Sequence, residues 1–332
     1  MIGAAILRYD PGFIEEAIFF AARRSPEARA FRRERDRLYE ISDIEERDRA
    51  FQQLNLKWFK GLELAAPIEK AVDEQPLVSS TVKWCVVARA PGKKEEGAEL
   101  FVSAEASLSE QDRRSVRLLL RPASLLDPEQ VLTFLRHELF HITDMLDPAF
   151  GYEPSLPAAE GGLTHDSLLR ERYRTLWDAT INGRMTRRNW LPPSARAEDF
   201  RSFICAFPMF APNAAEVFAA FFDREPHTHA ELAAFARGPR SAPYQEQKLE
   251  QENRCPLCRF PTFTFEPEPE RLEREVIAEI RRDFPSWQPS QRLCIQCADL
   301  YRARRVSVSA ALLLPGPAVH RKKDDTDEDV LA

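Results

Sequence analysis

Residues 135–141 read Leu-Arg-His-Glu-Leu-Phe-His and carry the most informative pattern of this 332-residue chain. They place His137 and His141 four positions apart, with Glu138 between them, in the spacing HExxH. On a helix, side chains at this spacing share one face, so the two imidazoles can bind one Zn²⁺. Glu138 then lies beside the cation, where it can take a proton from a zinc-bound water. The stretch therefore predicts half of a zinc-dependent hydrolase site, and a third ligand must come from elsewhere.

The flanking residues predict that the motif lies on a capped amphipathic helix of about five turns. Asp127 suits an N-cap, Pro128 suits the first helical position, and Asp147 with Pro148 ends the helix. Apolar residues recur at helical intervals and predict a buried stripe made of Val131, Leu132, Leu135, Leu139, Ile142 and Leu146. The alternative interpretation is that the two histidines fill polar niches and Glu138 is solvated.

At these residues the chain resembles the zincin metallopeptidases, whose active-site helix carries the motif. The resemblance implies Zn²⁺, a water nucleophile and Glu138 as general base. It covers one helix and its surroundings, so it implies a chemistry more than a substrate. Zincins draw the third zinc ligand from the next helix or from the loop before it, which points to the region that follows residue 148.

Asp178 is the predicted third ligand. It lies within a predicted helix over 166–188, beside Trp177 and among apolar neighbours, where an unpaired carboxylate is costly. Binding a metal would remove that cost. The alternative is a buried ion pair between Asp178 and an arginine such as Arg174 or Arg184. In the same helix, Gly183 is interpreted as a C-terminal cap or a bend.

Two other residues remain open as the third ligand. Glu171 lies seven positions before Asp178, on the same helical face, so periodicity does not separate the two. His165 is a good ligand type but lies where the loop meets the helix. A carboxylate that does not bind the metal can instead hold a ligand histidine in the correct tautomer, and Asp144 is a further candidate for that role.

The loop over 148–166 is long enough to line a cleft. Tyr152 in this loop could donate a hydrogen bond to a developing oxyanion, although a packing role is favoured. Further along, His227 and His229 are interpreted as residues of a solvated turn rather than metal ligands.

Residues 76–121 change from helical to alternating spacing. Apolar residues alternate over 82–86 and 100–104, and a third apolar run covers 116–120. The segment 91–97 has the Pro and Gly content of a hairpin turn between the first two runs. Three strands before the HExxH helix are an arrangement similar to that of zincins, in which the strand at the sheet edge holds an extended substrate by main-chain hydrogen bonds.

Four of the six cysteines form two CxxC pairs, Cys255 with Cys258 and Cys294 with Cys297. Two such pairs supply four thiolates to one tetrahedral Zn²⁺ with no open position, so this second zinc is predicted to be structural. Redox chemistry is disfavoured because neither pair lies in a βαβ context. Cys85 is predicted to be a small core residue rather than a nucleophile.

These patterns predict an α+β fold, mostly helical, with a zincin-like core and a C-terminal zinc ribbon. The predicted segments are a helical region over 1–75, the metallopeptidase core over 76–237, a linker over 238–253, the ribbon with a helical insert over 254–306, and a tail over 307–332 whose end is disordered.

Composition indicates which partners and which compartment we expect for the protein. The chain is 44% hydrophobic and 30% charged, and its net charge of −6 gives no overall field that attracts nucleic acid. No stretch approaches the roughly 20 apolar residues that span a bilayer. The apolar run over 2–7 is short and is soon followed by acidic residues, which is unlike a signal peptide. We expect a cytoplasmic protein without membrane contact.

The favoured function is a zinc-dependent metallopeptidase that acts on a protein or peptide. An HExxH core followed by a zinc ribbon also resembles the SprT-like, or Spartan-type, proteases, which act on DNA-associated proteins. That group has a glycine after its third histidine, whereas Asp166 follows His165 here. DNA binding would need a basic ribbon face, and the candidates are Arg254, Arg259, Arg292, Arg302, Arg304 and Arg305. An alternative from another class is a non-catalytic scaffold in which both metal sites are structural.

Overall fold

The structure, a computed structural model, describes residues 3–156, 163–210, 213–224, 227–238, 254–259, 262 and 264–313. It forms two compact units. The first consists of Met1–Pro157 and Leu169–Arg240, and the second of Ala158–Leu168 and Ser241–Ala332. The predicted linker after Gly238, and the predicted tail after Leu313, lie outside the described residues.

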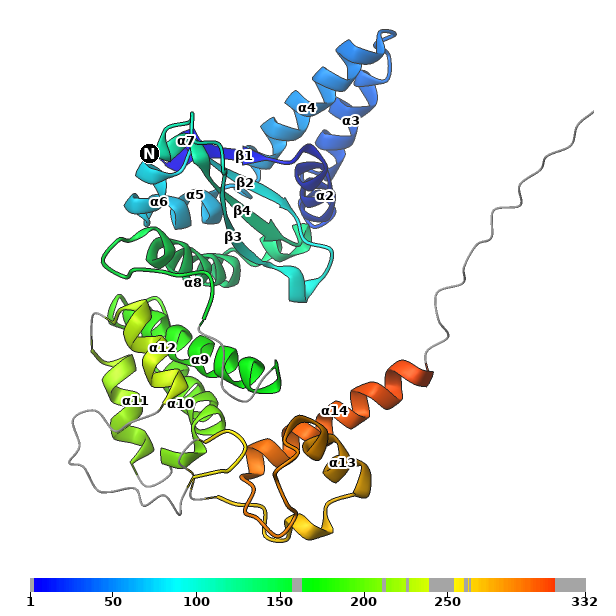
Figure 1. Cartoon of the computed structure of the whole chain (residues 1–332). Coiled ribbons are helices and arrows are strands. Elements are labelled where there is room, and N and C mark those ends of the chain that lie inside the picture. The colour runs from blue at the N-terminus through cyan, green and yellow to red at the C-terminus, as the bar shows by residue number, and fades with distance from the viewer. Residues whose placement is uncertain are drawn as a thin grey trace, which may run out of the picture. The chain divides into compact units, whose positions relative to one another are not determined.

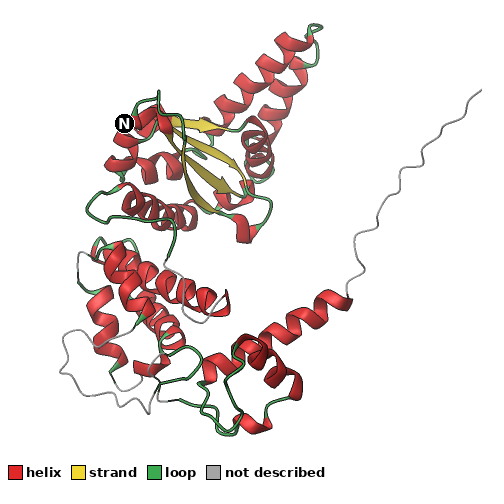
Figure 2. Ribbon diagram, in the orientation of Figure 1, coloured by secondary structure: helices red, strands yellow, loops and turns green. Residues whose placement is uncertain are grey.

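The first unit contains a four-stranded sheet in the order β1-β2-β4-β3, drawn in yellow in Figure 2. The strands are β1 (Leu7–Tyr9), β2 (Trp84–Arg89), β3 (Gly97–Val102) and β4 (Arg114–Leu120). The first three positions in the sheet are parallel, with Cys85 opposite both Leu7 and Val116. Only β3, at one edge, runs antiparallel to its neighbour, with Leu100 opposite Val116. The predicted α+β, mostly helical class is confirmed.

The sheet differs from the sequence-based expectation in two ways. Strand β1 lies within the region predicted to be helical, because three residues are too few to show a period and their partner strand is far away in sequence. The predicted hairpin between the runs at 82–86 and 100–104 is wrong, since β4 lies between β2 and β3 in the sheet. The Pro and Gly content of 91–97 indicates a turn, but it does not determine which strands pair.

Helices make up most of the first unit (Figure 1). They are α1 (Gly3–Ile6), α2 (Pro11–Ala22), α3 (Ala28–Leu38), α4 (Ile44–Gly61), α5 (Ala66–Asp73), α6 (Pro76–Thr81), α7 (Glu110–Arg113), α8 (Pro128–Leu146), α10 (Ser194–Ala206), α11 (Ala214–Phe222), α12 (His229–Arg237) and the part of α9 (Leu163–Arg187) from Leu169 onward. None of the helices in the described part of the chain has the length and apolarity needed to cross a bilayer.

Helix α8 carries the HExxH motif and begins and ends where the sequence predicts. The side chain of Asp127 accepts a hydrogen bond from the Gln130 N–H at its start, and Asp147 follows its last turn. Five of the six residues of the predicted stripe are buried, and they join the side chains of β2, β4, α2 and α5 in one core. This packing fixes the rotation of α8 about its axis, so the motif side chains face away from the core.

Helix α9 continues through Gly183 to Arg187, so the interpretation of Gly183 as a C-terminal cap is wrong. The glycine instead allows close packing of two helices. A Cβ atom at this position would lie 1.9 Å from the carbonyl oxygen of Phe222, at the end of α11. The same oxygen accepts a hydrogen bond of 2.7 Å from Arg187. Only a residue without a side chain fits here.

We expect Gly183→Ala to lower the free energy of unfolding by roughly 1–3 kcal/mol, because a backbone atom must move to accept the methyl group. This cost outweighs the gain of about 1 kcal/mol that alanine normally brings to a helix. Gly61→Ala is the matched control, since a Cβ there meets no atom within 4 Å. Urea unfolding of both variants checks the expectation, and equal stabilities would contradict it.

The second unit contains α13 (Arg274–Asp283) and α14 (Ile295–Leu313), which extends beyond the predicted end of the ribbon at 306. Its small core includes Leu272, Val276, Ile280, Trp287, Leu293 and Tyr301, together with cysteines of both CxxC pairs. Trp287 is only 2% exposed. A short β-bridge joins Phe265 to Cys294. This core is small, so little apolar burial is available to stabilise the unit.

Candidate metal centres

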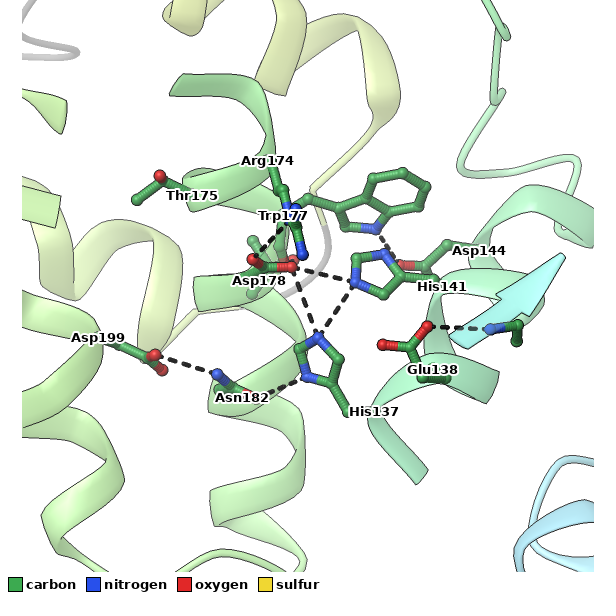
Figure 3. Close-up of polar contacts among 12 residues, drawn as sticks. His137, Glu138, His141, Asp144, Arg174, Thr175, Trp177, Asp178, Asn182 and Asp199 are labelled. Atoms are coloured by element: carbon green, nitrogen blue, oxygen red, sulfur yellow. Dashed lines mark hydrogen bonds and ion pairs between the residues drawn. The ribbon is translucent and has the colours of Figure 1, made fainter. Parts of the chain in front are cut away.

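The structure brings together His137 and His141 from α8 and Asp178 from α9 (Figure 3). The two Nε2 atoms are 3.2 Å apart. Asp178 Oδ1 lies 3.1 Å from His141 Nε2 and 3.5 Å from His137 Nε2. Three of the residues predicted from the sequence therefore converge on one point, although they come from two helices.

These separations fit a tetrahedral cation. With bonds of about 2.0–2.1 Å to nitrogen and oxygen, the ligand atoms of a tetrahedral zinc site lie about 3.3 Å from one another. The three distances of 3.1, 3.2 and 3.5 Å lie close to that value. The group could hold a metal ion through three protein atoms, which leaves a fourth tetrahedral position for a water molecule.

Glu138 extends beside the two histidine rings (Figure 3). Its Oε2 atom accepts a hydrogen bond of 3.1 Å from the N–H of Ala98, in edge strand β3. This bond leaves the other carboxylate oxygen free of any hydrogen bond to the described residues. The general base expected from the sequence is thus held by the edge of the sheet.

The ring of His141 packs against Trp177, with ring centroids 4.4 Å apart. The indole N–H of Trp177 donates to Asp144 over 2.7 Å, and Arg184 donates two hydrogen bonds to the same carboxylate. The sequence suggests Asp144 as a residue that orients a ligand histidine directly. In the structure it instead fixes Trp177, which in turn contacts His141.

Asp178 and His137 influence each other electrostatically. Burial raises the pKa of Asp178, but hydrogen bonds from His137 and His141 outweigh it and hold that pKa well below its usual value. Burial lowers the pKa of His137, yet the hydrogen bond and charge of Asp178 raise it above its usual value. Arg174 lies 3.6 Å from the other Asp178 oxygen, but its side chain is 82% exposed and contributes little.

These shifts predict how the metal-free protein responds to pH. Asp178 adds to the free energy of unfolding above its unfolded pKa of about 4, and this stabilisation is lost as the pH falls toward its lower folded pKa. His137 adds to the free energy of unfolding below its unfolded pKa of about 6.5, and this stabilisation is lost as the pH rises through its higher folded pKa.

Between pH values of about 4 and 6.5, with metal chelated, Asp178→Asn should reduce the free energy of unfolding by roughly 1–3 kcal/mol. Denaturant unfolding at pH values inside and above the window measures this difference, and an equal loss at both would contradict it.

The other two candidates for the third ligand lie elsewhere. The side chain of Glu171 is exposed, and the residue is not part of the cluster. His165 belongs to the second unit, where it is 2% exposed and its Nε2 lies 3.7 Å from Cys297 Sγ. Its ring also packs edge-on against Phe284. The sequence places His165 close to the HExxH helix, but it gives no sign of a contact with cysteines more than a hundred positions away.

The second candidate centre consists of Cys255, Cys258, Cys294 and Cys297. Their sulfur atoms all lie within 4.8 Å of one another. The separations are 3.9 Å for Cys255–Cys297 and 3.8 Å for Cys258–Cys294. With Zn–S bonds of about 2.3 Å, sulfur atoms in a tetrahedral site lie about 3.8 Å apart. Backbone N–H groups of Cys294 and Cys297 also point at sulfur atoms, over 3.4 and 3.3 Å. This group, too, could hold a metal ion.

Two of the arginines considered for a basic face have acidic partners in the second unit. Arg302 pairs with Asp299 and Glu266, and Arg304 pairs with Asp283. Their charges are therefore partly offset within the second unit, and the side chain of Arg305 lies outside the described residues.

The sequence does not indicate an aromatic cluster around Trp177. Its members include Phe150, Tyr152, Tyr173 and His229. His229 is 4% exposed, its backbone N–H donates to the Phe150 carbonyl, and Tyr173 Oη lies 2.7 Å from its Nδ1. The expectation of a solvated turn is wrong for His229, because this residue is the first of α12 and its side chain is buried.

Comparison of the chain with protein families, with curated proteins and with solved structures found no match. The functional interpretation therefore depends on the geometry of the two centres.

Proposed function

We propose that this protein is a zinc-dependent peptidase, with His137, His141 and Asp178 as zinc ligands and Glu138 as general base. The observation that carries the proposal is the convergence of three ligand atoms at 3.1–3.5 Å beside the Glu138 carboxylate. Three protein ligands with one open position are typical of catalytic zinc, whereas structural sites have four. On this proposal the first unit contains a zincin-like core, and the second is a zinc ribbon with a structural ion.

The chain's own groups would perform the proton transfers. When bound, the cation would supply a Lewis acid that polarises the scissile carbonyl and lowers the pKa of a water molecule. Glu138 would accept a proton from that water as its oxygen bonds to the carbonyl carbon. It would then give the proton to the amine nitrogen as the C–N bond breaks. The Ala98 N–H would hold the carboxylate in place during both transfers.

Strand β3 supports an extended peptide as the substrate. Its partner β4 lies on one side only, so the other side is a sheet edge. The Ala98 N–H points to this edge, because it donates to Glu138, whereas the N–H of Ser103 donates to Arg113 next to β4. With a period of two, the main-chain groups of Leu100 and Val102 also face the open edge. A peptide could pair with this edge as a further strand, and its backbone would then lie next to Glu138 and the proposed zinc ligands.

The proposal does not extend to DNA-associated substrates. The order of the two centres along the chain resembles that of the SprT-like proteases, but Arg302 and Arg304 are engaged in ion pairs. A protein or peptide substrate needs no such basic surface.

Metal analysis and peptide cleavage together test the proposal. We expect the full chain to bind two zinc ions, and the zinc-loaded protein to cleave peptides in a mixture derived from unfolded proteins, as detected by mass spectrometry. His141→Leu should retain the cysteine-bound ion, lose the other and cleave nothing. A wild-type protein that binds a single zinc ion, or one with two ions that leaves every peptide intact, would contradict the proposal.

A further inference from the structure

We propose that Asn182 and Asp199 act together as positioning residues that determine which ring nitrogen of His137 faces the cation. This inference depends on the proposed metal centre. It adds two residues that the HExxH pattern does not include, one on α9 and one on α10 (Figure 3).

His137 and Asn182 are in contact through their side chains. His137 uses Nε2 toward the metal cluster, and its Nδ1 lies 2.9 Å from the side-chain oxygen of Asn182. A carbonyl oxygen can only accept, so Nδ1 must carry the hydrogen. In the neutral ring, Nε2 then has a free electron pair, as a metal ligand requires. Asn182 follows Asp178 by four positions and so lies on the same face of α9.

The hydrogen bond to Asp199 fixes the orientation of the Asn182 amide. An amide can rotate by half a turn and present its NH₂ group where its oxygen was. With NH₂ facing His137, Nδ1 would become the acceptor and Nε2 would carry the hydrogen, which excludes a metal there. Asp199 prevents this rotation, because its Oδ1 accepts a hydrogen bond of 3.0 Å from the Asn182 NH₂ group. An ionised carboxylate offers no hydrogen, so it accepts only the NH₂ end.

The state of Asp199 itself supports a functional role. Its Oδ2 atom is buried and accepts no hydrogen bond from any described residue. Burial raises the pKa of Asp199 to about 6, although the bond from Asn182 opposes the rise. The carboxylate is thus mainly ionised at neutral pH, in surroundings that disfavour its charge. A group kept in such a position at a cost to stability often serves a function.

A purely structural role of Asn182 and Asp199 would have different consequences. The Asn182–Asp199 hydrogen bond also joins α9 to α10, and a bond with that role alone would be indifferent to which partner is the acid. The positioning role has two stricter requirements. The side chain at position 182 must accept a hydrogen bond from His137 Nδ1. The side chain at position 199 must prevent an amide at position 182 from rotating by half a turn. Exchanging the two residue types satisfies both requirements, because a carboxylate at position 182 would accept both from His137 and from the amide placed at position 199.

The experiment therefore compares Asp199→Asn with a double variant that combines Asn182→Asp and Asp199→Asn in the full chain. Asp223→Asn is the matched control. Asp223 follows α11 and makes an exposed ion pair with Arg196, which lies on α10 like Asp199. The tautomer of His137 is measured by side-chain nitrogen NMR in metal-free protein, at a pH where the ring is neutral. Zn²⁺ affinity is measured by competition titration, with the four-cysteine group as internal reference.

We expect Asp199→Asn to give a mixture of His137 tautomers and to weaken zinc binding at this centre roughly 10- to 100-fold. The double variant should restore the Nδ1–H tautomer and most of the affinity, and Asp223→Asn should change neither. An unchanged tautomer and affinity in Asp199→Asn, or a double variant as weak as Asp199→Asn, would overturn the inference. If the wild type binds no zinc at this centre, the proposed function fails, but the tautomer measurement still decides the inference.

Discussion

Glu138→Gln is expected to leave zinc bound at both centres and to reduce peptide hydrolysis by about 10²- to 10⁴-fold, the usual share of a general base. The substitution keeps the shape of the side chain. A glutamine oxygen can still accept the N–H of Ala98, so the local structure should persist. What it loses is the ability to take a proton from water, because an amide is not a base at neutral pH.

Glu171→Gln is the control for Glu138→Gln. It makes the same chemical change on the exposed side of α9. It also tests the alternative third ligand, since a metal site that included Glu171 would lose affinity. We expect this variant to bind zinc and cleave peptides like the wild type. Equal turnover in Glu138→Gln and the wild type would exclude Glu138 as the base. A protein whose cellular function survives Glu138→Gln would instead be a scaffold with two structural ions.

The second large effect is expected from loss of the four-cysteine centre. Cys255→Ser should unfold most of the second unit, because a structural zinc ion contributes about 10–16 kcal/mol to the folding of small modules. The core around Val276, Ile280 and Trp287 offers too little apolar burial to compensate. Cys255 is fully buried and its Sγ accepts a hydrogen bond of 3.4 Å from the Cys294 N–H, so its replacement also alters a local contact.

Hydrogen exchange measures this prediction region by region. Exchange should become fast in α13 and around the Phe265–Cys294 bridge, while β2 and β4 of the first unit keep their protection. Cys205→Ser is the control, because Cys205 is exposed and lies outside the cysteine cluster. Retained protection in α13 after Cys255→Ser would mean that the unit folds without its ion.

The parts of the site that the sequence predicts are those with local signals. The position of α8 follows from Asp127, Pro128 and the apolar stripe, and the relation of His137 to His141 follows from helical spacing. The CxxC spacing likewise predicts that the two cysteines of each pair lie close enough to bind one metal ion. Asp178 could be proposed because a carboxylate among apolar residues needs a partner, and the structure brings it to the two histidines.

The parts that the sequence does not predict depend on pairing between distant segments. Asn182 and Asp199 are ordinary polar residues of amphipathic helices until α9 and α10 pack together. The contact of His165 with Cys297 and the burial of His229 have the same origin. Arg172 is fully buried and donates to the carbonyl of Ala206, although an arginine in sequence usually indicates a surface. Composition and periodicity report on one segment at a time and miss these contacts.

The place of β1 in the sheet has a consequence for how the protein forms during synthesis. Leu7–Tyr9 are synthesised before Trp84–Arg89, which form β2, the strand with which they pair. Strand β1 must therefore wait for several helices to be translated before it can pair, and closing such a long loop slows the step. During that interval the apolar residues of β1 lack their partner strand and are accessible to chaperones or to neighbouring chains.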